Sequence, residues 1–229
     1  MNCWICGGVA DTREHTLKVS DLKQYFGRIS QTRPLFHHAD SSNNLRLNTV
    51  RTEKLTSSTL LCGTCNNSST QRHDKAWERT SAYLHKNWPT IIKQGHFDLS
   101  KVFPGGTKAG ALDVHLYFLK LFGCRVLEGK IPIDTGAFAT AIRERKAHPD
   151  VFLTVAATPP LPIKRIANIS DINTLQVEGA AVAAAWTYTF APVCIRILYS
   201  TESARYQPRK GCWHPDSSTK LVKLGKYEM

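Results

Sequence analysis

The residues whose types and spacing most directly predict chemistry are four cysteines in two Cys-x2-Cys pairs, Cys3/Cys6 and Cys62/Cys65. Four thiolates spaced in this way can close a tetrahedral zinc site. Because such a site leaves no coordination position open to water, we expect the zinc to be structural and to fasten two distant segments together. The grouping in pairs argues against the alternative of four unrelated buried thiols.

A Glu14-His15 dipeptide lies between the two cysteine pairs, and Asn66 follows the last cysteine directly. Hydrolysis of a phosphodiester requires an activated water and stabilisation of the charge on the phosphoryl oxygens. A neutral histidine can take the proton of that water, and a carboxylate with an amide oxygen suits Mg2+ or Mn2+. We therefore interpret His15, Glu14 and Asn66 as catalytic residues, with Glu14 and Asn66 as ligands of a catalytic divalent ion. His73 is a further candidate ligand, for which a capping or surface role is the alternative.

Glu14 and His15 can serve one site only if the backbone departs from a regular strand between them. Neighbouring side chains on an extended strand point to opposite faces. The sequence therefore predicts a break in strand geometry at Glu14. For a Glu-His pair taken alone, the simpler interpretation is surface polarity, and only its place between two zinc half-sites favours the functional one.

Turn residues and hydrophobic periodicity predict the elements that must position these side chains. A turn at Gly7-Gly8 leads into a strand over residues 9–15, and residues 64–83 have the composition of one or two helices. A capping box at Ser68-x-x-Gln71 is expected to begin the helical segment, and Pro89 is expected to limit it.

The rest of the chain mixes helical and strand patterns. Helices are predicted over residues 110–122 and 135–146, and strands over residues 151–156, 175–177 and 192–199. This mixture predicts an α+β fold. No nucleotide-binding or hydrolase motif occurs in this part of the sequence, so its role is not predicted.

The chain is strongly basic, with 30 Lys and Arg against 18 Asp and Glu and a formal charge of +12. Such a charge favours a polyanionic partner. Residues 16–57 form a polar, basic insertion that is a candidate nucleic-acid surface. Its candidate phosphate contacts are Lys18, Lys23, Arg28, Arg33, Arg46 and Arg51. The alternative, a solvated excursion that only connects the two halves of the zinc site, has similar weight.

The sequence predicts a cytoplasmic protein without a membrane span. The chain opens without the basic start and apolar run of a signal peptide. Its most apolar stretch, residues 179–195, is rich in alanine and interrupted by Pro192. Seven cysteines, an odd number with four in Cys-x2-Cys pairs, fit a reducing compartment better than a disulfide framework.

The order of these motifs resembles a known family. Cys-x2-Cys, then Glu14-His15, then Leu-Leu-Cys-x2-Cys-Asn is similar to the HNH, or ββα-metal, endonucleases, in the zinc-stapled subgroup that includes phage junction-resolving nucleases. The resemblance implies a β-hairpin followed by a helix, with a divalent ion between them. It also implies that His15 is the general base, Glu14 the acidic metal ligand and Asn66 the helix residue that completes the metal site. Ser57 stands where the family often has an asparagine before the third cysteine.

We therefore expect an N-terminal zinc-stapled ββα-metal domain over residues 1–95, followed by a smaller α+β domain over residues 96–229 that binds substrate or a partner. The expected function is a metal-dependent endonuclease that cuts DNA, or structured RNA, in a phage-defence or mobile-element system. One alternative is a non-catalytic zinc module that binds nucleic acid or a protein. Another is a nuclease subunit that docks through residues 96–229 and is inert alone.

Overall fold

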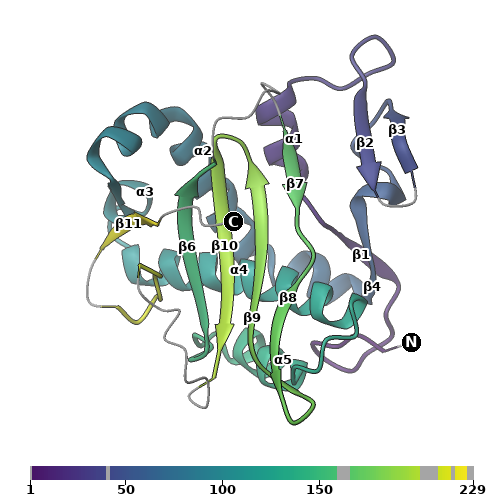
Figure 1. Cartoon of the computed structure of the whole chain (residues 1–229), viewed down its shortest axis with the longest axis vertical. Coiled ribbons are helices and arrows are strands. Elements are labelled where there is room, and N and C mark those ends of the chain that lie inside the picture. The colour runs from purple at the N-terminus through teal and green to yellow at the C-terminus, as the bar shows by residue number, and fades with distance from the viewer. Residues whose placement is uncertain (1, 40–41, 159–165, 202–210, 218–219, 226–229) are drawn as a thin grey trace.

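A seven-stranded sheet with two long helices on one face organises the computed structural model of the chain (Figure 1). The structure describes residues 2–39, 42–158, 166–201, 211–217 and 220–225. The strand order is β5-β11-β6-β10-β9-β7, and β8 also pairs with β9. The pairing is antiparallel except between β11 and β6. The strands are β5 (His96–Asp98), β6 (Val151–Ala157), β7 (Ala167–Ile169), β8 (Asn173–Val177), β9 (Ala180–Phe190), β10 (Val193–Ser200) and β11 (Leu221–Gly225).

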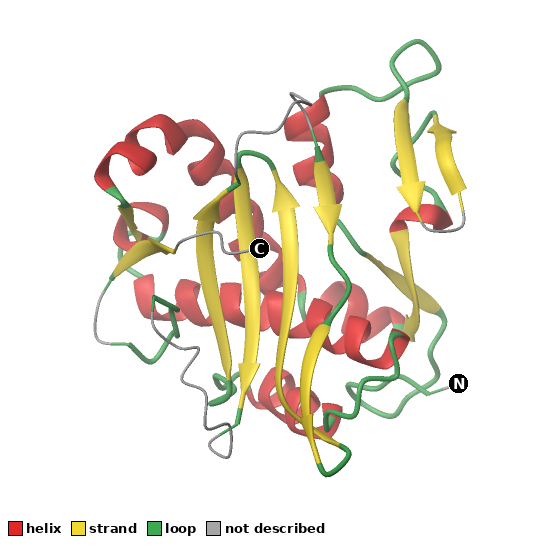
Figure 2. Cartoon of the chain, in the orientation of Figure 1, coloured by secondary structure: helices red, strands yellow, loops and turns green. Residues whose placement is uncertain are grey.

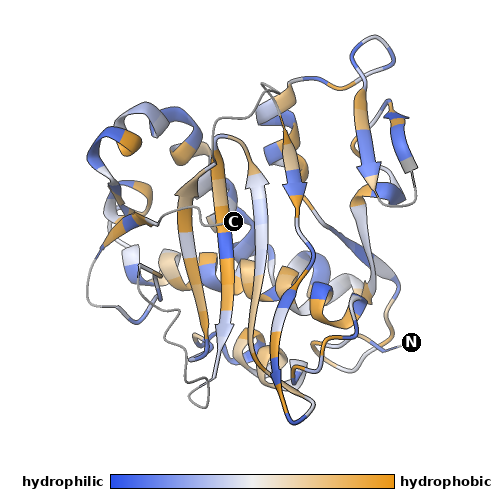
Figure 3. Ribbon diagram, viewed as in Figure 1, coloured by the Kyte–Doolittle hydropathy of each residue, from blue (hydrophilic) through white to orange (hydrophobic). Residues whose placement is uncertain are grey.

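The helices precede most of these strands in the chain, and the mixture confirms the predicted α+β class (Figure 2). The helices are α1 (Val19–Phe26), α2 (Gln71–Gln94), α3 (Leu99–Val102), α4 (Thr107–Glu128) and α5 (Thr135–Glu144). The predicted helices over residues 110–122 and 135–146 correspond to α4 and α5. Figure 3 shows hydrophobic segments along β6 and β10, the central strands of the sheet, which agrees with their burial.

Helix α2 extends past the limit predicted at Pro89, so that prediction is wrong. Pro89 lies inside the helix, whose buried face continues from Trp88 to Ile91. Packing of that face keeps the helix in place despite the hydrogen bond that proline cannot donate. The helix ends at Gly95, which adopts a left-handed conformation with φ of 70° and donates its N–H to the carbonyl of Ile91.

The predicted capping box is also wrong. The hydroxyl of Ser68 donates to the carbonyl of Thr64 at 3.2 Å inside a short π-helical turn, η2 (Thr64–Ser68). Helix α2 then begins after Thr70, whose side chain makes no capping hydrogen bond. The turn at η2 therefore uses the Ser68 hydroxyl that the capping box would have required.

The N-terminal part contains the predicted order of two antiparallel strands and a helix. Strand β1 (Thr12–His15) pairs with β4 (Thr56–Leu61), and η2 and α2 follow β4. The register shifts between Arg13 and His15, at the position of Glu14. This irregularity confirms the break in strand geometry that the sequence predicts there.

The insertion between β1 and β4 has regular structure of its own (Figure 1). It contains α1, the hairpin of β2 (Leu35–Ala39) and β3 (Ser42–Leu47), and a short 3-10 turn η1 (Glu53–Leu55). Leu22 of α1 and Leu47 of β3 are buried. The insertion is therefore a folded element with buried side chains and exposed cations.

One hydrophobic core runs through both predicted segments. The Trp77 ring on α2 lies 5.7 Å from the Tyr117 ring of α4 and 5.9 Å from the Tyr188 ring of β9. The boundary at residue 95 stays a prediction, and extensive packing crosses it. The second segment is the larger one rather than the smaller one, because it holds the seven-stranded sheet and α4. Among the described residues, none of the helices has the length and apolar character needed to cross a membrane.

Candidate zinc centre and active site

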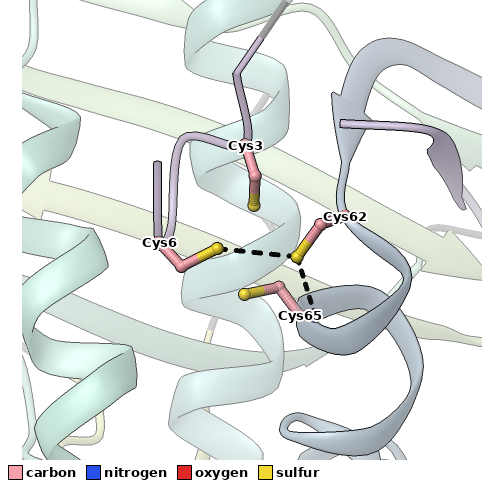
Figure 4. A group of neighbouring side chains, drawn as sticks. All are labelled: Cys3, Cys6, Cys62 and Cys65. Carbon is pink, nitrogen blue, oxygen red and sulfur yellow. Dashed lines mark hydrogen bonds between the residues drawn. The ribbon is translucent and has the colours of Figure 1, made fainter. Parts of the chain in front are cut away.

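The four cysteine sulfurs form one cluster in which all Sγ atoms lie within 4.8 Å of one another (Figure 4). The Sγ atoms of Cys6 and Cys62 are 3.5 Å apart. Zinc–sulfur bonds of about 2.3 Å in a tetrahedron place the sulfurs about 3.8 Å apart, so the donor set fits zinc. The cluster can therefore hold a metal ion such as zinc, and it joins the N-terminal loop to the end of β4 and to η2.

Two backbone N–H groups donate hydrogen bonds to sulfurs of the cluster. The N–H of Gly8 donates to Cys6 Sγ at 3.4 Å, and the N–H of Cys65 donates to Cys62 Sγ at 3.3 Å. The Gly8 N–H and the neighbouring Cys62 thiol lower the pKa of Cys6 to about 7. The first loop is held by a hydrogen bond from Gly7 N to Cys3 O at 2.8 Å, with Gly7 at a φ of 78° that favours glycine.

His15 is half-buried at the end of β1 and borders a cavity of about 10 Å³. Ser57, Arg125 and Trp186 also line this cavity. Within the described part of the chain, His15 Nδ1 and Arg125 Nε are buried and have no hydrogen-bond partner. The volume is close to what one water molecule needs. A water that bridges these two atoms would fix the orientation of the His15 ring.

Ser57 does not orient the His15 ring directly. Its hydroxyl donates to Glu128 Oε1 at 3.2 Å, and the N–H of Ser58 also donates to that carboxylate. This contact fixes β4 to the C-terminal end of α4.

The electrostatic surroundings keep His15 neutral at pH 7. Burial, followed by the positive charges of Lys18 and Arg51, lowers the pKa of His15 below its usual value of 6.5. A neutral imidazole can accept a proton. The positive charges of Lys18 and Arg51 would also attract a phosphate group.

Glu14 is buried and forms an ion pair with a lysine of α4. Lys120 Nζ lies 2.8 Å from Glu14 Oε2, 3.5 Å from Asp74 Oδ1 and 3.2 Å from Thr70 Oγ1. The Lys120 side chain has 0% exposure. Burial would lower the pKa of Lys120, but the carboxylates of Glu14 and Asp74 outweigh burial and raise that pKa above its usual value. The ammonium group therefore stays charged between β1 and the start of α2.

Asn66 lies in η2, beside β1. Its Nδ2 donates to the backbone carbonyl of Arg13 at 3.1 Å. The carboxamide thus fixes η2 to β1 at the residue before Glu14.

These residues do not fit the divalent ion predicted at Glu14 and Asn66 while the Lys120 ion pair is in place. Glu14 is the one carboxylate of that predicted ligand set, and the ammonium group holds it. Mg2+ also requires oxygen ligands at about 2.1 Å in near-octahedral geometry. An ion at Glu14 would therefore have to displace the Lys120 ammonium.

His73 belongs to a different cluster. It is 1% exposed, and its Nε2 lies 3.5 Å from Asp113 Oδ1, an atom that also contacts Arg72 and Arg145. Burial lowers the pKa of His73 to about 4, so it is neutral at pH 7. In the part of the chain that the structure describes, the four cysteines form the one group of three or more His, Cys, Asp and Glu side chains placed to hold a metal.

The predicted phosphate contacts divide into two groups. Lys18 is held in an ion pair, with its Nζ 3.0 Å from Asp74 Oδ1. The other side chains are exposed on the insertion: Lys23, Arg28, Arg33, Arg46 and Arg51. Arg46 also donates to the carbonyl of Gln31. This exposed group remains available to a polyanion.

Sequence reasoning missed Lys120 and Arg125. The signal for Lys120 was its place in the apolar run from Leu116 to Phe122, where a charged side chain is expected to have a buried partner. The sequence did not indicate which carboxylate that partner would be, because the contact joins residues of different elements. No family model, curated protein or solved structure was found to match the chain.

Proposed function

We propose that this protein is a zinc-stapled endonuclease that hydrolyses phosphodiester bonds in DNA, with His15 as the general base. One observation carries the proposal. The irregular end of β1 presents a histidine that is neutral at pH 7 beside Lys18 and Arg51, on a strand pair that the cysteine cluster fastens to the start of α2.

The chemistry assigned to His15 follows from its two ring nitrogens. Nδ1 is buried without a hydrogen-bond partner, and His15 lines the small cavity, where a water that accepts from Nδ1 would hold its proton. The other nitrogen, Nε2, is then the base that removes a proton from the attacking water. Negative charge that develops on the phosphoryl oxygens is stabilised by nearby cations such as Arg51.

Glu14 and Asn66 have positioning roles in this proposal. Glu14 connects the irregular end of β1 to Lys120, and Asn66 connects η2 to Arg13. A requirement for Mg2+ or Mn2+ at Glu14 is not included, because the ion pair with Lys120 holds that carboxylate. Phage defence or a mobile element is the proposed context, and structured RNA is the second substrate class.

The test compares cleavage of supercoiled plasmid by zinc-loaded wild-type protein, His15→Gln and His85→Gln. His85 is exposed on α2 and serves as the control. Loss of a general base costs about 10²- to 10⁴-fold in rate. We expect His15→Gln to lose cleavage by that factor while it retains zinc and cooperative unfolding. Equal cleavage by His15→Gln and wild type would rule out the catalytic assignment.

The second candidate function is a zinc module that binds nucleic acid without cutting it, or that docks on a protein through residues 96–229. The buried ion pair of Glu14 favours this candidate, since it withdraws a carboxylate from substrate. The same preparations distinguish the two functions. A module that only binds would retain plasmid in a mobility-shift assay and leave it uncut, with no difference between wild type and His15→Gln.

A further inference from the structure

We propose that Lys120 is the built-in cation of this site: its ammonium takes the position between Glu14 and Asp74 that a divalent ion would otherwise take, so the wild-type protein binds no Mg2+ or Mn2+ at Glu14. The role of Lys120 in catalysis rests on the proposed function. The absence of a divalent ion at Glu14 does not, and it can be tested without nucleic acid.

The geometry around Lys120 Nζ is that of a filled cation site. Oxygens of Glu14, Thr70 and Asp74 surround the nitrogen at 2.8, 3.2 and 3.5 Å. Glu14 comes from β1, and the other two residues come from the start of α2. Two carboxylates and a hydroxyl are hard oxygen donors of the kind that Mg2+ and Mn2+ accept. The distances from the nitrogen are those of hydrogen bonds and ion pairs of an ammonium group.

The buried carboxylates already have cations without a metal ion. Glu14 and Asp74 contact Lys120, and Asp74 also lies 3.0 Å from Lys18 Nζ, which in turn lies 3.6 Å from the partly exposed Glu78. A divalent ion added to these groups would bring two further positive charges into a buried region. Such a charge is costly to bury.

Lys120 cannot readily leave this position. It is fully buried in α4, and its neighbours Leu119 and Leu121 are 0% and 2% exposed. The helix packs against α2, β4 and α5, and an ammonium group withdrawn from the carboxylates would enter an apolar core. Lys120 is therefore a fixed part of the site, whereas a metal ion would exchange with solvent.

Lys120 acts on the active site through Glu14. The ion pair holds the strand at the register shift next to His15 and connects it to the start of α2. We therefore assign Lys120 as a positioning residue. Its ammonium group holds the end of β1 as a bound metal ion would, but it belongs to the protein chain.

The experiment measures Mn2+ binding to the zinc-loaded full-length chain by electron paramagnetic resonance of the free ion. We expect no stoichiometric site tighter than about 1 mM in the wild type. Lys120→Met leaves Glu14 and Asp74 without their cation. This variant should gain a Mn2+ site whose dissociation constant is at least tenfold below the limit for the wild type. The double variant Lys120→Met/Glu14→Gln should lose that site again. Lys93→Met, at an exposed lysine in the last turn of α2, is the control and should match the wild type.

A second measurement on the wild type decides the question if Lys120→Met does not fold. Mn2+ broadens nearby amide signals in a 15N-resolved NMR spectrum. Unchanged signals for Glu14, Thr70 and Asp74 support the inference, and selective broadening of these three signals at stoichiometric Mn2+ overturns it. Failure of the nuclease proposal would appear instead as equal plasmid cleavage by wild type and His15→Gln, which has no bearing on Mn2+ binding.

Discussion

The phenolic hydroxyl of Tyr188 donates a hydrogen bond of 2.6 Å to the buried carboxylate of Asp21, and the two residues are 167 positions apart in the chain. The same carboxylate accepts hydrogen bonds from Trp77 Nε1 at 2.8 Å and from Ser81 Oγ at 2.6 Å. Asp21 lies in α1 of the insertion, Trp77 and Ser81 lie in α2, and Tyr188 lies in β9. This contact makes the sheet of the second segment a structural support for the insertion of the first.

We expect Tyr188→Phe to lower the free energy of unfolding by about 1–3 kcal/mol, because the buried Asp21 carboxyl group loses one of its hydrogen-bond donors. Equilibrium denaturation in urea measures this change as a shift of the midpoint at constant slope. Tyr83→Phe, on the partly buried side of α2, is the matched control and should change stability by less than about 0.5 kcal/mol. Equal stability of Tyr188→Phe and wild type would contradict a supporting role for this hydrogen bond.

The spacing of residues was enough to predict the local features of the site. The two Cys-x2-Cys pairs predicted the sulfur cluster, because ligand spacing is a direct requirement of tetrahedral coordination. The need to place Glu14 and His15 near one site predicted the register shift at Glu14. The helical segments α4 and α5 were also predicted, although α4 extends beyond both predicted ends and α5 ends before its predicted end.

The features that depend on contacts between distant segments were not predicted. The pairing of Lys120 with Glu14 requires α4 to dock behind β1, and sequence spacing carries no information on that docking. The continuation of α2 past Pro89 depends on burial of Trp88 and Ile91 in the common core. Tertiary packing therefore decided both the partner of Glu14 and the end of α2 against the local signals.

The cysteine cluster predicts a dependence of folding on zinc. We expect about one zinc per chain by elemental analysis and a large loss of helical signal in circular dichroism after chelation, because binding free energy at such sites is folding free energy. Cys65→Ser removes a buried ligand and should lower both zinc content and stability. Cys212→Ser changes a thiol outside the cluster and should retain zinc. Native protein without zinc would contradict this interpretation of the cluster.

The lowered pKa of His15 predicts the acid limb of the activity profile. The rate of plasmid cleavage should fall as the pH drops through the pKa of His15, which lies below 6.5, because only the neutral imidazole accepts a proton. Arg51→Gln removes one of the charges that lower this pKa, so the limb should move to higher pH, with burial still opposing protonation. Arg28→Gln, exposed in the same insertion, is the control. An acid limb that does not move in Arg51→Gln would contradict the assignment of this limb to His15.

The exposed cations of the insertion predict salt-dependent binding of nucleic acid. The combined variant with glutamine at Lys23, Arg28 and Arg33 should bind DNA more weakly across all sequences. The slope of log K against log salt should become shallower by roughly one unit for each phosphate group that the variant no longer neutralises. A triple variant at Lys101, Lys130 and Arg143, exposed in the second segment, matches the charge removed. Equal effects of the two variants would show that net charge alone determines binding.

The neutral, buried His73 predicts a loss of stability in mild acid. Burial lowers its pKa to about 4 in the folded state, whereas the unfolded chain has the usual value of 6.5. Between these values the unfolded state binds more protons, so stability is fully present above pH 6.5 and falls as pH drops toward 4. Its contribution is at most roughly 3 kcal/mol. His73→Gln should reduce the difference in unfolding free energy between pH 7 and pH 4.5, measured by urea denaturation at both values. His85→Gln, at an exposed histidine of the same helix, should leave that difference unchanged. An equal difference in His73→Gln and wild type would show that folding does not lower the pKa of His73.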